Sequence, residues 1–448
     1  MPETLNVVVR EGEFVGRSLA ISLHECLRYL PGRRAVHRAS GRQGEAWLVK
    51  RFVHPDKALS DAKKEWESIQ TLRKKGIPTP APAFLAQADD HWVLATEYLA
   101  EAVTLQDQKA PDLQAFLELI NLGYKAGAVQ DDLHLDNFLS HLGRLYCVDA
   151  ASFRFFPNAA PMDAQLANLA LLKANIPLPW QVELEQSWGA MPAIGESVYR
   201  QVLIKRIRKF ARKCERTCTA FERIERSGIT LWRTRDCPAW IDDWVTLSRD
   251  QLRKRAEVLK DGDSCLVVRH EQDWVLKRRF YKGRLPVVWK RRSRARKSWI
   301  AGNVLRLIGL NTPKPWACWE IRKQGKLISD GLLMSNDPGT ALHEWVREPD
   351  HRPEIRFNVA ANFRVLFDQF ALIGASHGDT KASNFRIGTE GDLRVIDLDS
   401  FTLHRTSKRA KRMARRDRER FARNQKKYPE GKDIFAVVSS PPRDAPTE

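Results

Sequence analysis

Long apolar runs and secretory features are missing from this sequence. No run of 18 apolar residues occurs, and the amino-terminal MPETLNVVVREGEF has acidic residues where a signal peptide needs a basic start and an apolar core. Low-complexity tracts are also absent, and 43% of the residues are hydrophobic, which indicates folded cores rather than a disordered chain. We therefore expect a cytoplasmic protein that is at most peripheral to a membrane.

Cysteine pairs are missing too, and acidic residues are in the minority. The seven cysteines are scattered without a Cys-x-x-Cys pair, which argues against a disulfide framework and a structural zinc site. The 55 acidic residues are outnumbered by 75 lysines and arginines, and the net charge of +20 favours polyanionic partners. No nucleic-acid-binding signature accompanies this charge, so we expect an anionic membrane surface or a phosphorylated substrate rather than nucleic acid.

A repeat divides the 448 residues into two similar halves. Four segments of the first half return in the second half in the same order. The paired segments are 45–52 with 273–280, 65–82 with 298–315, 131–139 with 378–386, and 145–153 with 393–401. The first pair predicts a strand that carries a lysine, and the second predicts a helix ended by glycine and proline. We predict a duplicated domain, with a boundary near Ser227 and Gly228 that separates residues 1–228 from 229–448.

The third and fourth segments contain the residue types that phosphoryl transfer needs. That reaction uses a carboxylate near the acceptor hydroxyl, an amide oxygen and a second carboxylate on Mg²⁺, and lysine on the nucleotide phosphates. In the second half His377, Asp379 and Asn384 form the pattern His-x-Asp-x4-Asn. Asp397 follows thirteen residues after Asn384, at the end of a predicted strand. Lys381 stands two residues after Asp379, where it would face the phosphates.

The first half keeps this spacing with one replacement. Asp132 and Asn137 reproduce the loop, and Asp149 follows twelve residues after Asn137. Gln130 replaces the histidine, which in such loops is mainly a structural support, so the chemistry is not cancelled. The predicted catalytic carboxylates are Asp132 and Asp379, and the predicted metal ligands are Asn137, Asp149, Asn384 and Asp397.

Two strand lysines, Lys50 and Lys277, complete the predicted nucleotide sites. Lys50 has an expected helical partner in Glu65, fifteen residues further on. Ser298 stands at the matching position of the second half, so Lys277 lacks its expected partner unless another acid substitutes. The predicted contacts to the nucleotide are therefore made by Lys50, Glu65, Lys277 and Lys381.

The sequence has no glycine-rich phosphate loop of the usual form. No Gly-x-Gly-x-x-Gly precedes either strand lysine. Gly41 and Gly44 in the first half, and Gly262 in the second, are the nearest candidates. The predicted phosphate cover therefore depends on isolated glycines.

A basic segment closes each half. Residues 208–226 and 405–427 are both predicted as cationic helices, and the second has twelve lysines and arginines among 23 residues. Either segment can be a solvated part of the repeated fold. The second can also meet anionic lipid headgroups, which attract nearby basic residues by about 1 kcal/mol each. Its only large apolar residues are Met413 and Phe421, so any such attraction should be electrostatic.

Together these features resemble the bacterial lipopolysaccharide kinase family, whose kinase-like enzymes phosphorylate heptose or Kdo sugars of the lipid A core. The resemblance rests on HGDTKASNF with VIDLDSF, on KRF followed by EW and GIPTPAP, and on TEYL (96–99) as a hinge between lobes. It covers most of both halves. It implies an α+β fold of two tandem protein-kinase-like domains, each with a small β-rich lobe and a larger helical lobe. It also implies ATP and Mg²⁺, and a sugar acceptor of the lipopolysaccharide inner core at the cytoplasmic face of the inner membrane.

Two functions remain open after this comparison of residues. The first is a kinase of a lipopolysaccharide core sugar with at least one active half. The second is a scaffold or regulator of pseudokinase type in lipopolysaccharide core assembly, which Gln130 and Ser298 favour. The sequence leaves the acceptor hydroxyl, and a protein as the alternative target, undecided.

Overall fold

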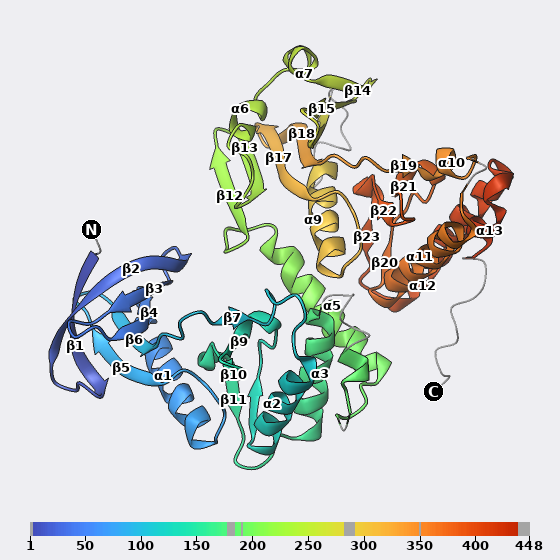
Figure 1. Cartoon of the computed structure of the whole chain (residues 1–448). Coiled ribbons are helices and arrows are strands. Elements are labelled where there is room, and N and C mark those ends of the chain that lie inside the picture. The colour runs from blue at the N-terminus through green and yellow to red at the C-terminus, as the bar shows by residue number, and fades with distance from the viewer. Residues whose placement is uncertain (1–2, 177–183, 190, 282–291, 349–350, 438–448) are drawn as a thin grey trace. The chain divides into compact units, whose positions relative to one another are not determined.

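The computed structural model describes residues 3–176, 184–189, 191–281, 292–348 and 351–437 (Figure 1). The chain divides into two compact units, residues 1–202 and 203–448, and both are of mixed α+β class, as predicted. The boundary predicted at Ser227 and Gly228 falls instead in the turn between β12 (Phe221–Arg226) and β13 (Ile229–Thr234). These two strands pair within the sheet of the second unit, so that unit begins earlier than the repeat indicates.

The first unit begins with a closed six-stranded barrel, ordered β1-β2-β3-β4-β6-β5, in which β4 carries Lys50. The strands are β1 (Glu3–Gly12), β2 (Ser18–Leu30), β3 (Arg34–Ser40), β4 (Ala46–Phe52), β5 (Pro82–Gln87) and β6 (Trp92–Glu97). Buried side chains such as Val49, Phe84 and Val93 form the core of the barrel. Helix α1 (Ala58–Lys74) follows β4 and ends before Gly76, whose φ of 72° suits glycine better than any other residue.

The remainder of the first unit consists of helices and short strand pairs. Its elements are β7 (Val103–Thr104), α2 (Leu113–Lys125), β8 (Ala128–Gln130), β9 (Phe138–His141), β10 (Arg144–Cys147), β11 (Phe153–Phe155), α3 (Met162–Asn175) and α5 (Glu196–Lys213), which spans the boundary. Because β8 pairs with β11 and β9 pairs with β10, the loops after β8 and β10 meet. A hydrogen bond from Asp131 N to Ser152 O, 2.9 Å long, joins them.

The second unit is built on a seven-stranded sheet, ordered β12-β13-β17-β18-β16-β15-β14. Its further strands and nearby helices are α6 (Ile241–Trp244), α7 (Arg249–Arg255), β14 (Glu257–Gly262), β15 (Cys265–His270), β16 (Trp274–Phe280), α9 (Arg294–Leu307), β17 (Pro315–Lys323) and β18 (Lys326–Ser335). The order β14-β15-β16-β18-β17 matches the order β2-β3-β4-β6-β5 of the first unit. Lys277 on β16 therefore occupies the position that Lys50 has on β4.

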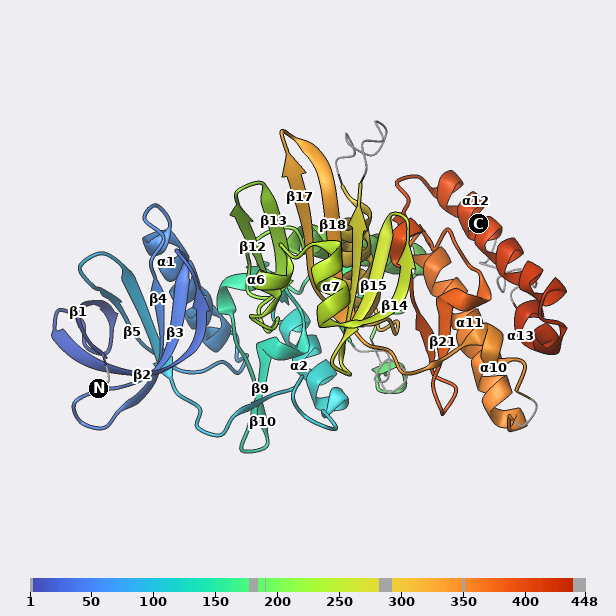
Figure 2. The same ribbon diagram turned by 90° about the horizontal axis from the view of Figure 1, so that it is seen from above.

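Helices dominate the rest of the second unit. The elements are β19 (Thr340–Ala341), α10 (Leu342–Trp345), α11 (Pro353–Leu372), β20 (Ala375–Ser376), β21 (Phe385–Ile387), β22 (Leu393–Val395), β23 (Thr402–Leu403), α12 (Ser407–Ala422) and α13 (Lys432–Ala436). Figures 1 and 2 show α11 and α12 side by side. Their contact includes Phe363 and Phe367 of α11, whose ring centroids lie 4.5 and 5.3 Å from that of Phe421 on α12.

The two basic segments do not share one structure. The prediction of a cationic helix over residues 208–226 is correct only for residues 208–213, because α5 ends at Lys213 and Phe221–Arg226 form strand β12. Pairing with β13 places Ile224 opposite Leu231, and this sheet contact overrides the helical propensity of the segment. Residues 405–427 do contain the predicted helix, α12.

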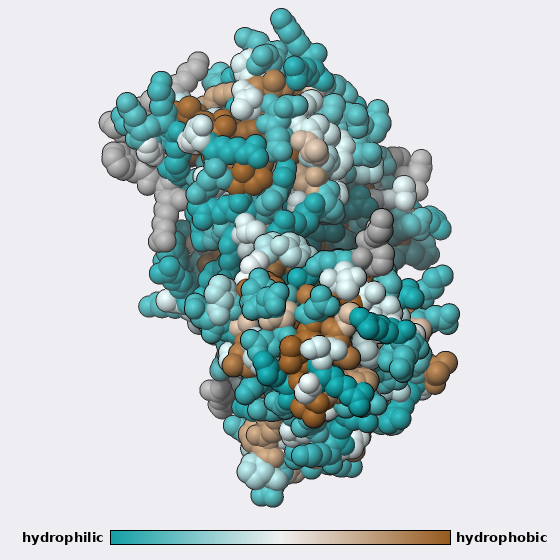
Figure 3. All heavy atoms as spheres, turned by 90° about the vertical axis from the view of Figure 1, so that its left-hand side faces the viewer, coloured by the Kyte–Doolittle hydropathy of each residue, from teal (hydrophilic) through white to brown (hydrophobic). Residues whose placement is uncertain are grey.

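Surface character differs between the buried and outward sides of α12. Ala410, Asp417 and Phe421 are buried, whereas Arg415 and Arg416 are exposed, so the basic residues face away from the core. Within the described part of the chain, no helix is both long and apolar enough to cross a bilayer. Hydrophilic side chains cover most of the face drawn in Figure 3, and hydrophobic ones gather in smaller areas between them.

Candidate functional site

In the second unit the predicted residues Asp379, Asn384 and Asp397 lie on two adjoining loops. Asn384 donates from Nδ2 to the backbone oxygen of Asp379 at 2.8 Å and to its carboxylate at 3.1 Å. The backbone oxygen of Asn384 accepts from Ile396 N at 2.9 Å, which fastens this loop to the residue before Asp397. Asp397 itself has a left-handed φ of 58°, a conformation that aspartate adopts more readily than most residues.

The first unit repeats this arrangement around Asp132, Asn137 and Asp149. Asn137 Nδ2 donates to the backbone oxygen of Asp132 at 2.8 Å, and Val148 N donates to the backbone oxygen of Asn137 at 2.9 Å. Asp149 has a φ of 59°, nearly the same as its counterpart in the second unit. The structure therefore brings the predicted aspartates and asparagine together in each unit.

Gln130 makes the contact that His377 makes in the second unit. Gln130 Nε2 donates to the backbone oxygen of Val148 at 3.0 Å, and His377 Nε2 lies 3.1 Å from the backbone oxygen of Ile396. Burial lowers the pKa of His377, so the ring is neutral and carries its proton on the nitrogen that faces this oxygen. Both side chains hold the residue before the left-handed aspartate, and replacement of histidine by glutamine leaves that support intact.

A buried side chain of helix α12, Asp417, holds the candidate catalytic loop of the second unit through hydrogen bonds to its backbone. Asp417 of α12 accepts from His377 N at 2.6 Å and from Gly378 N at 3.1 Å. Asn424 donates from Nδ2 to the backbone oxygen of Thr380 at 3.0 Å. Burial raises the pKa of Asp417 to about 6, although the two amide hydrogen bonds oppose this effect.

Helix α3 performs the same anchoring in the first unit. Asn168 donates to the backbone oxygen of Gln130 at 2.7 Å, and Asn175 donates to that of Leu133 at 2.5 Å. The two asparagines are seven residues apart, as are Asp417 and Asn424. The structural counterpart of α12 is therefore α3 rather than residues 208–226, and this seven-residue spacing is the signal that sequence reasoning missed.

Lys50 has the partner that the sequence predicts. Lys50 Nζ forms an ion pair with Glu65, whose side chain is only 1% exposed. Arg34 lies 3.5 Å from Glu65 and 3.8 Å from Asp149, and it thereby links the ion pair of Lys50 and Glu65 to the loop that carries the predicted metal ligand Asp149. The first unit thus gathers its cationic and acidic groups next to the candidate loops.

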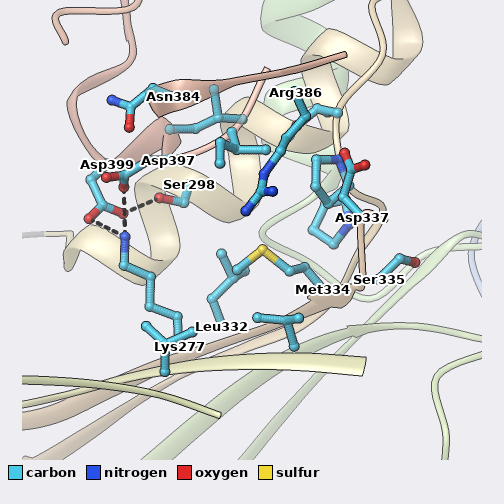
Figure 4. Close-up of a pocket in the computed structure, with 18 of the residues that line it drawn as sticks. Lys277, Ser298, Leu332, Met334, Ser335, Asp337, Asn384, Arg386, Asp397 and Asp399 are labelled. Carbon is cyan, nitrogen blue, oxygen red and sulfur yellow. Dashed lines mark hydrogen bonds and ion pairs between the residues drawn. The ribbon is translucent and has the colours of Figure 1, made fainter. Parts of the chain in front are cut away.

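Lys277 has a different acidic partner, which the sequence analysis did not name. Its Nζ lies 2.6 Å from Asp397 and 2.9 Å from Asp399, and Ser298 Oγ donates to Asp399 at 2.8 Å (Figure 4). The matching position in the first unit is Ala151. The acidic partner of the strand lysine therefore lies on helix α1 in the first unit and on the loop after β22 in the second unit. The sequence could have indicated this difference, because VIDLDSF has a second aspartate where VDAASF has alanine.

Burial and neighbouring charges have opposite effects on the pKa values of Asp399 and Lys277. Burial alone would raise the pKa of Asp399, but Arg279 and Lys277 outweigh burial and hold this pKa well below its usual range. Burial would likewise lower the pKa of Lys277, but Asp399 and Asp397 together outweigh burial and raise this pKa. Arg279 is 4% exposed and also contacts the fully buried Asp330 at 3.4 Å. This network holds both the lysine and the carboxylate in their charged forms.

The second unit contains a cavity of about 410 Å³ lined by these residues. Lys277, Asp397 and Asp399 lie at one end of it, and Arg386 and Asp337 lie toward the other end (Figure 4). Asp337 Oδ1 accepts a hydrogen bond from Arg394 at 2.8 Å. Asp337 Oδ2 is buried without a hydrogen-bond partner among the described residues. The cavity thus offers a cation and carboxylates at one end and a free acceptor at the other.

Lys381 and the glycines differ in how well they fit the prediction. Lys381 lines the cavity and lies 3.3 Å from the carboxylate of Asp379. Gly262 ends β14, in the turn that leads to β15. Gly41 and Gly44 lie in the β3–β4 turn, but the turn equivalent to β14–β15 is β2–β3. Gly41 and Gly44 therefore do not occupy the position equivalent to that of Gly262, because the whole of strand β3 separates them from the β2–β3 turn.

Asparagine and aspartate oxygens are the groups that could hold Mg²⁺. Among the described residues, no group of three or more His, Cys, Asp or Glu side chains is arranged for a metal ion. Magnesium needs fewer protein ligands, because it commonly binds one or two carboxylates and completes its shell with phosphates and water. Since Asn384 Nδ2 is engaged by Asp379, its Oδ1 is the atom left for a cation. The donor set therefore fits a magnesium ion that arrives with a nucleotide.

Comparison with protein-family models and with curated proteins found no match for this sequence. The function must accordingly be argued from the residues of the site. In each unit these are a lysine, an asparagine and carboxylates held on two joined loops. Such a set could hold a metal-bound polyanion, with one further aspartate beside it.

Proposed function

We propose that the chain is an ATP-dependent kinase of two tandem protein-kinase-like units that phosphorylates a hydroxyl group of a sugar. The observation that carries the proposal is the repeated set of strand lysine, loop asparagine and two loop aspartates. The same order of five strands around each lysine supports a duplicated kinase-like fold. The cavity of about 410 Å³ is of the size that ligand sites usually have.

Each group has a role that its position supports. Asp379 would accept the proton of the acceptor hydroxyl while the oxygen attacks the γ-phosphorus, and the bond from this phosphorus to the bridging oxygen breaks as ADP leaves. Lys277 would bind nucleotide phosphates, and Asn384 and Asp397 would bind Mg²⁺. Magnesium, when bound, neutralises charge on the phosphates. Asp337 Oδ2 is available to a donor on the nucleotide sugar or base.

The acceptor that we propose is a heptose or Kdo sugar of the lipopolysaccharide inner core. This choice rests on the motif resemblance and on the exposed basic side of α12, which suits a phosphorylated acceptor. It places the reaction at the cytoplasmic face of the inner membrane. The direct test incubates purified protein with labelled ATP, Mg²⁺ and core oligosaccharide from a strain that lacks this chain. Transfer of label to the oligosaccharide is the expected result, and its absence contradicts this acceptor.

A non-catalytic scaffold in lipopolysaccharide core assembly is the second candidate. The observation that favours it is the 2.6 Å contact between Lys277 and Asp397, which engages a phosphate-binding cation with a metal ligand. A unit that stays in this state would bind a partner protein without catalysing phosphoryl transfer. Gln130 no longer favours this candidate, because it supports its loop as His377 does.

Nucleotide binding provides a separate prediction for the two units. Isothermal titration of the full chain with a non-hydrolysable ATP analogue and Mg²⁺ should give two sites per chain. Lys50→Met and Lys277→Met should each remove one site, because each deletes the cation that faces the phosphates. Lys63→Met is the control, since this exposed lysine lies on the same helix as Glu65 and should leave both sites unchanged. No binding in the unmodified chain would contradict the kinase proposal.

Membrane association provides a further prediction that uses salt. Sedimentation with vesicles of phosphatidylglycerol should fall steeply as ionic strength rises from tens to hundreds of millimolar, because screening shortens to about 10 Å and below. Gln substitutions of the exposed Arg415 and Arg416 should weaken binding further. The control is Arg418→Gln, because Arg418 is only 13% exposed and pairs with Asp368. Binding that is insensitive to salt and to these substitutions would leave α12 as a solvated helix.

A further inference from the structure

The candidate catalytic carboxylate of the second unit lies between two cations from different elements. Arg420 of α12 contacts Asp379 Oδ1 through Nη2 at 2.6 Å, and its Nη1 lies 3.4 Å from the backbone oxygen of Gly378. Lys381 Nζ lies 3.3 Å from Asp379 Oδ2. Both cations are about half exposed, at 46% and 50%, whereas Asp379 is 23% exposed. The two cations therefore form the outer rim around the carboxylate.

The matching positions of the first unit carry different chemistry. Arg420 stands three residues after Asp417, and the residue three after Asn168 is Leu171. Lys381 corresponds to His134, which lies 3.7 Å from Asp132. The fold is thus compatible with a loop that lacks this arginine, so Arg420 is not needed to build it. Its presence in only one unit points to a property of the acceptor there.

We propose that Arg420 binds an anionic group of the acceptor, so that the second unit phosphorylates a hydroxyl compound that already carries a phosphate or carboxylate. The inference rests on the proposed kinase function. Arginine remains charged at all relevant pH values, and its fork of N–H donors matches phosphate and carboxylate oxygens. A half-exposed arginine at the rim can reach such a group while the acceptor hydroxyl faces Asp379.

The present contact also implies an order of events. Arg420 Nη2 lies 2.6 Å from Asp379 Oδ1 in an ion pair without hydrogen-bond geometry, and Oδ1 is buried, so the arginine keeps an acceptor hydroxyl from reaching this atom. An anionic acceptor competes for the guanidinium and releases Oδ1 as the hydroxyl arrives. A neutral acceptor offers no such exchange. Arg420 would therefore select acidic acceptors and hold the base inactive without one. A soluble sugar phosphate and a lipid headgroup present the same oxygens to this arginine.

Inorganic phosphate is the probe for this site. The full chain, saturated with a non-hydrolysable ATP analogue and Mg²⁺ so that the nucleotide positions are filled, is titrated with phosphate at constant ionic strength. Arg420→Gln should weaken phosphate binding by about tenfold, the scale of one charge-assisted contact. Arg420→Lys keeps the charge and should recover part of the affinity. Arg418→Gln is the matched control, because Arg418 of the same helix is only 13% exposed and pairs with Asp368; it should change affinity less than twofold.

The outcomes separate this inference from the proposed function. Failure of the analogue to bind contradicts the kinase proposal itself. Analogue binding with equal phosphate affinity in the unmodified chain and in Arg420→Gln contradicts only the role of Arg420, as does an equal loss in Arg418→Gln. A parallel titration with phosphatidylglycerol vesicles distinguishes the two sources. Weaker vesicle binding in Arg420→Gln than in Arg418→Gln assigns the anion to a headgroup, and equal binding assigns it to a soluble acceptor.

Discussion

Phosphoryl transfer should fall by at least about a hundredfold when Asp132→Asn and Asp379→Asn are combined, which is the usual scale for loss of a general base. Asparagine has nearly the size of aspartate but cannot take up the proton of the acceptor hydroxyl. The loops should remain folded, because Asn137 and Asn384 donate to the backbone oxygens of these two residues and not only to their side chains. Initial rates of labelled phosphate transfer from ATP to core oligosaccharide measure the effect.

The single variants and one control complete this experiment. A large loss in only one single variant identifies the active unit, and partial losses in both indicate two active units. Asp368→Asn is the matched control, since Asp368 is 48% exposed and contacts α12 through Arg418 at 2.7 Å. Its rate should equal that of the unmodified protein. Full activity in the double variant would contradict the assignment of Asp132 and Asp379 as bases.

The largest effect on stability is expected from Asp399→Ala. This substitution leaves Arg279 and Lys277 without their shared carboxylate, and removal of one partner from a buried ion pair costs about 3–5 kcal/mol. Hydrogen exchange followed by mass spectrometry assigns the loss to the second unit, because peptides from β16 should lose protection while those from β4 should not. Asp392→Ala, which removes a 39% exposed partner of Arg394, should cost less than about 1 kcal/mol.

A compensating variant and a pH series test the physical reason for this effect. Ser298→Glu combined with Asp399→Ala gives the second unit the helix acid that Glu65 supplies in the first, and it should recover part of the protection at β16.

Arg279 and Lys277 hold the pKa of Asp399 below its usual range, so its stabilising contribution is complete above about pH 5 and declines as the pH falls below about 4. Asp399→Ala should therefore show less acid sensitivity than the unmodified protein. Unchanged protection in Asp399→Ala would contradict the network.

Much of the candidate site could be derived from the repeat. Residue types at fixed short spacing predicted that Asp379 and Asn384 belong to one site, and their side chains are in contact because the four residues between them limit how far they can separate. A lysine strand followed by a helix similarly predicted the pair of Lys50 and Glu65. The resemblance of these segments to a kinase family implied the α+β class, which the structure has. Local spacing is sufficient in such cases, since the chain between the residues is short.

Only the tertiary structure decided the partners that lie far apart in the chain. Ser298 and Asp399 are 101 residues apart, and sequence comparison identified the loss of the helix acid but not the loop acid that replaces it. Arg420 meets Asp379 only because α12 packs against the candidate catalytic loop through Asp417. The sequence by itself determined which residue types each loop presents. Folding decided which distant side chains of opposite charge pair with the charged residues of these loops. A buried charged side chain pairs with the opposite charge that the packing of helices and strands brings close to it.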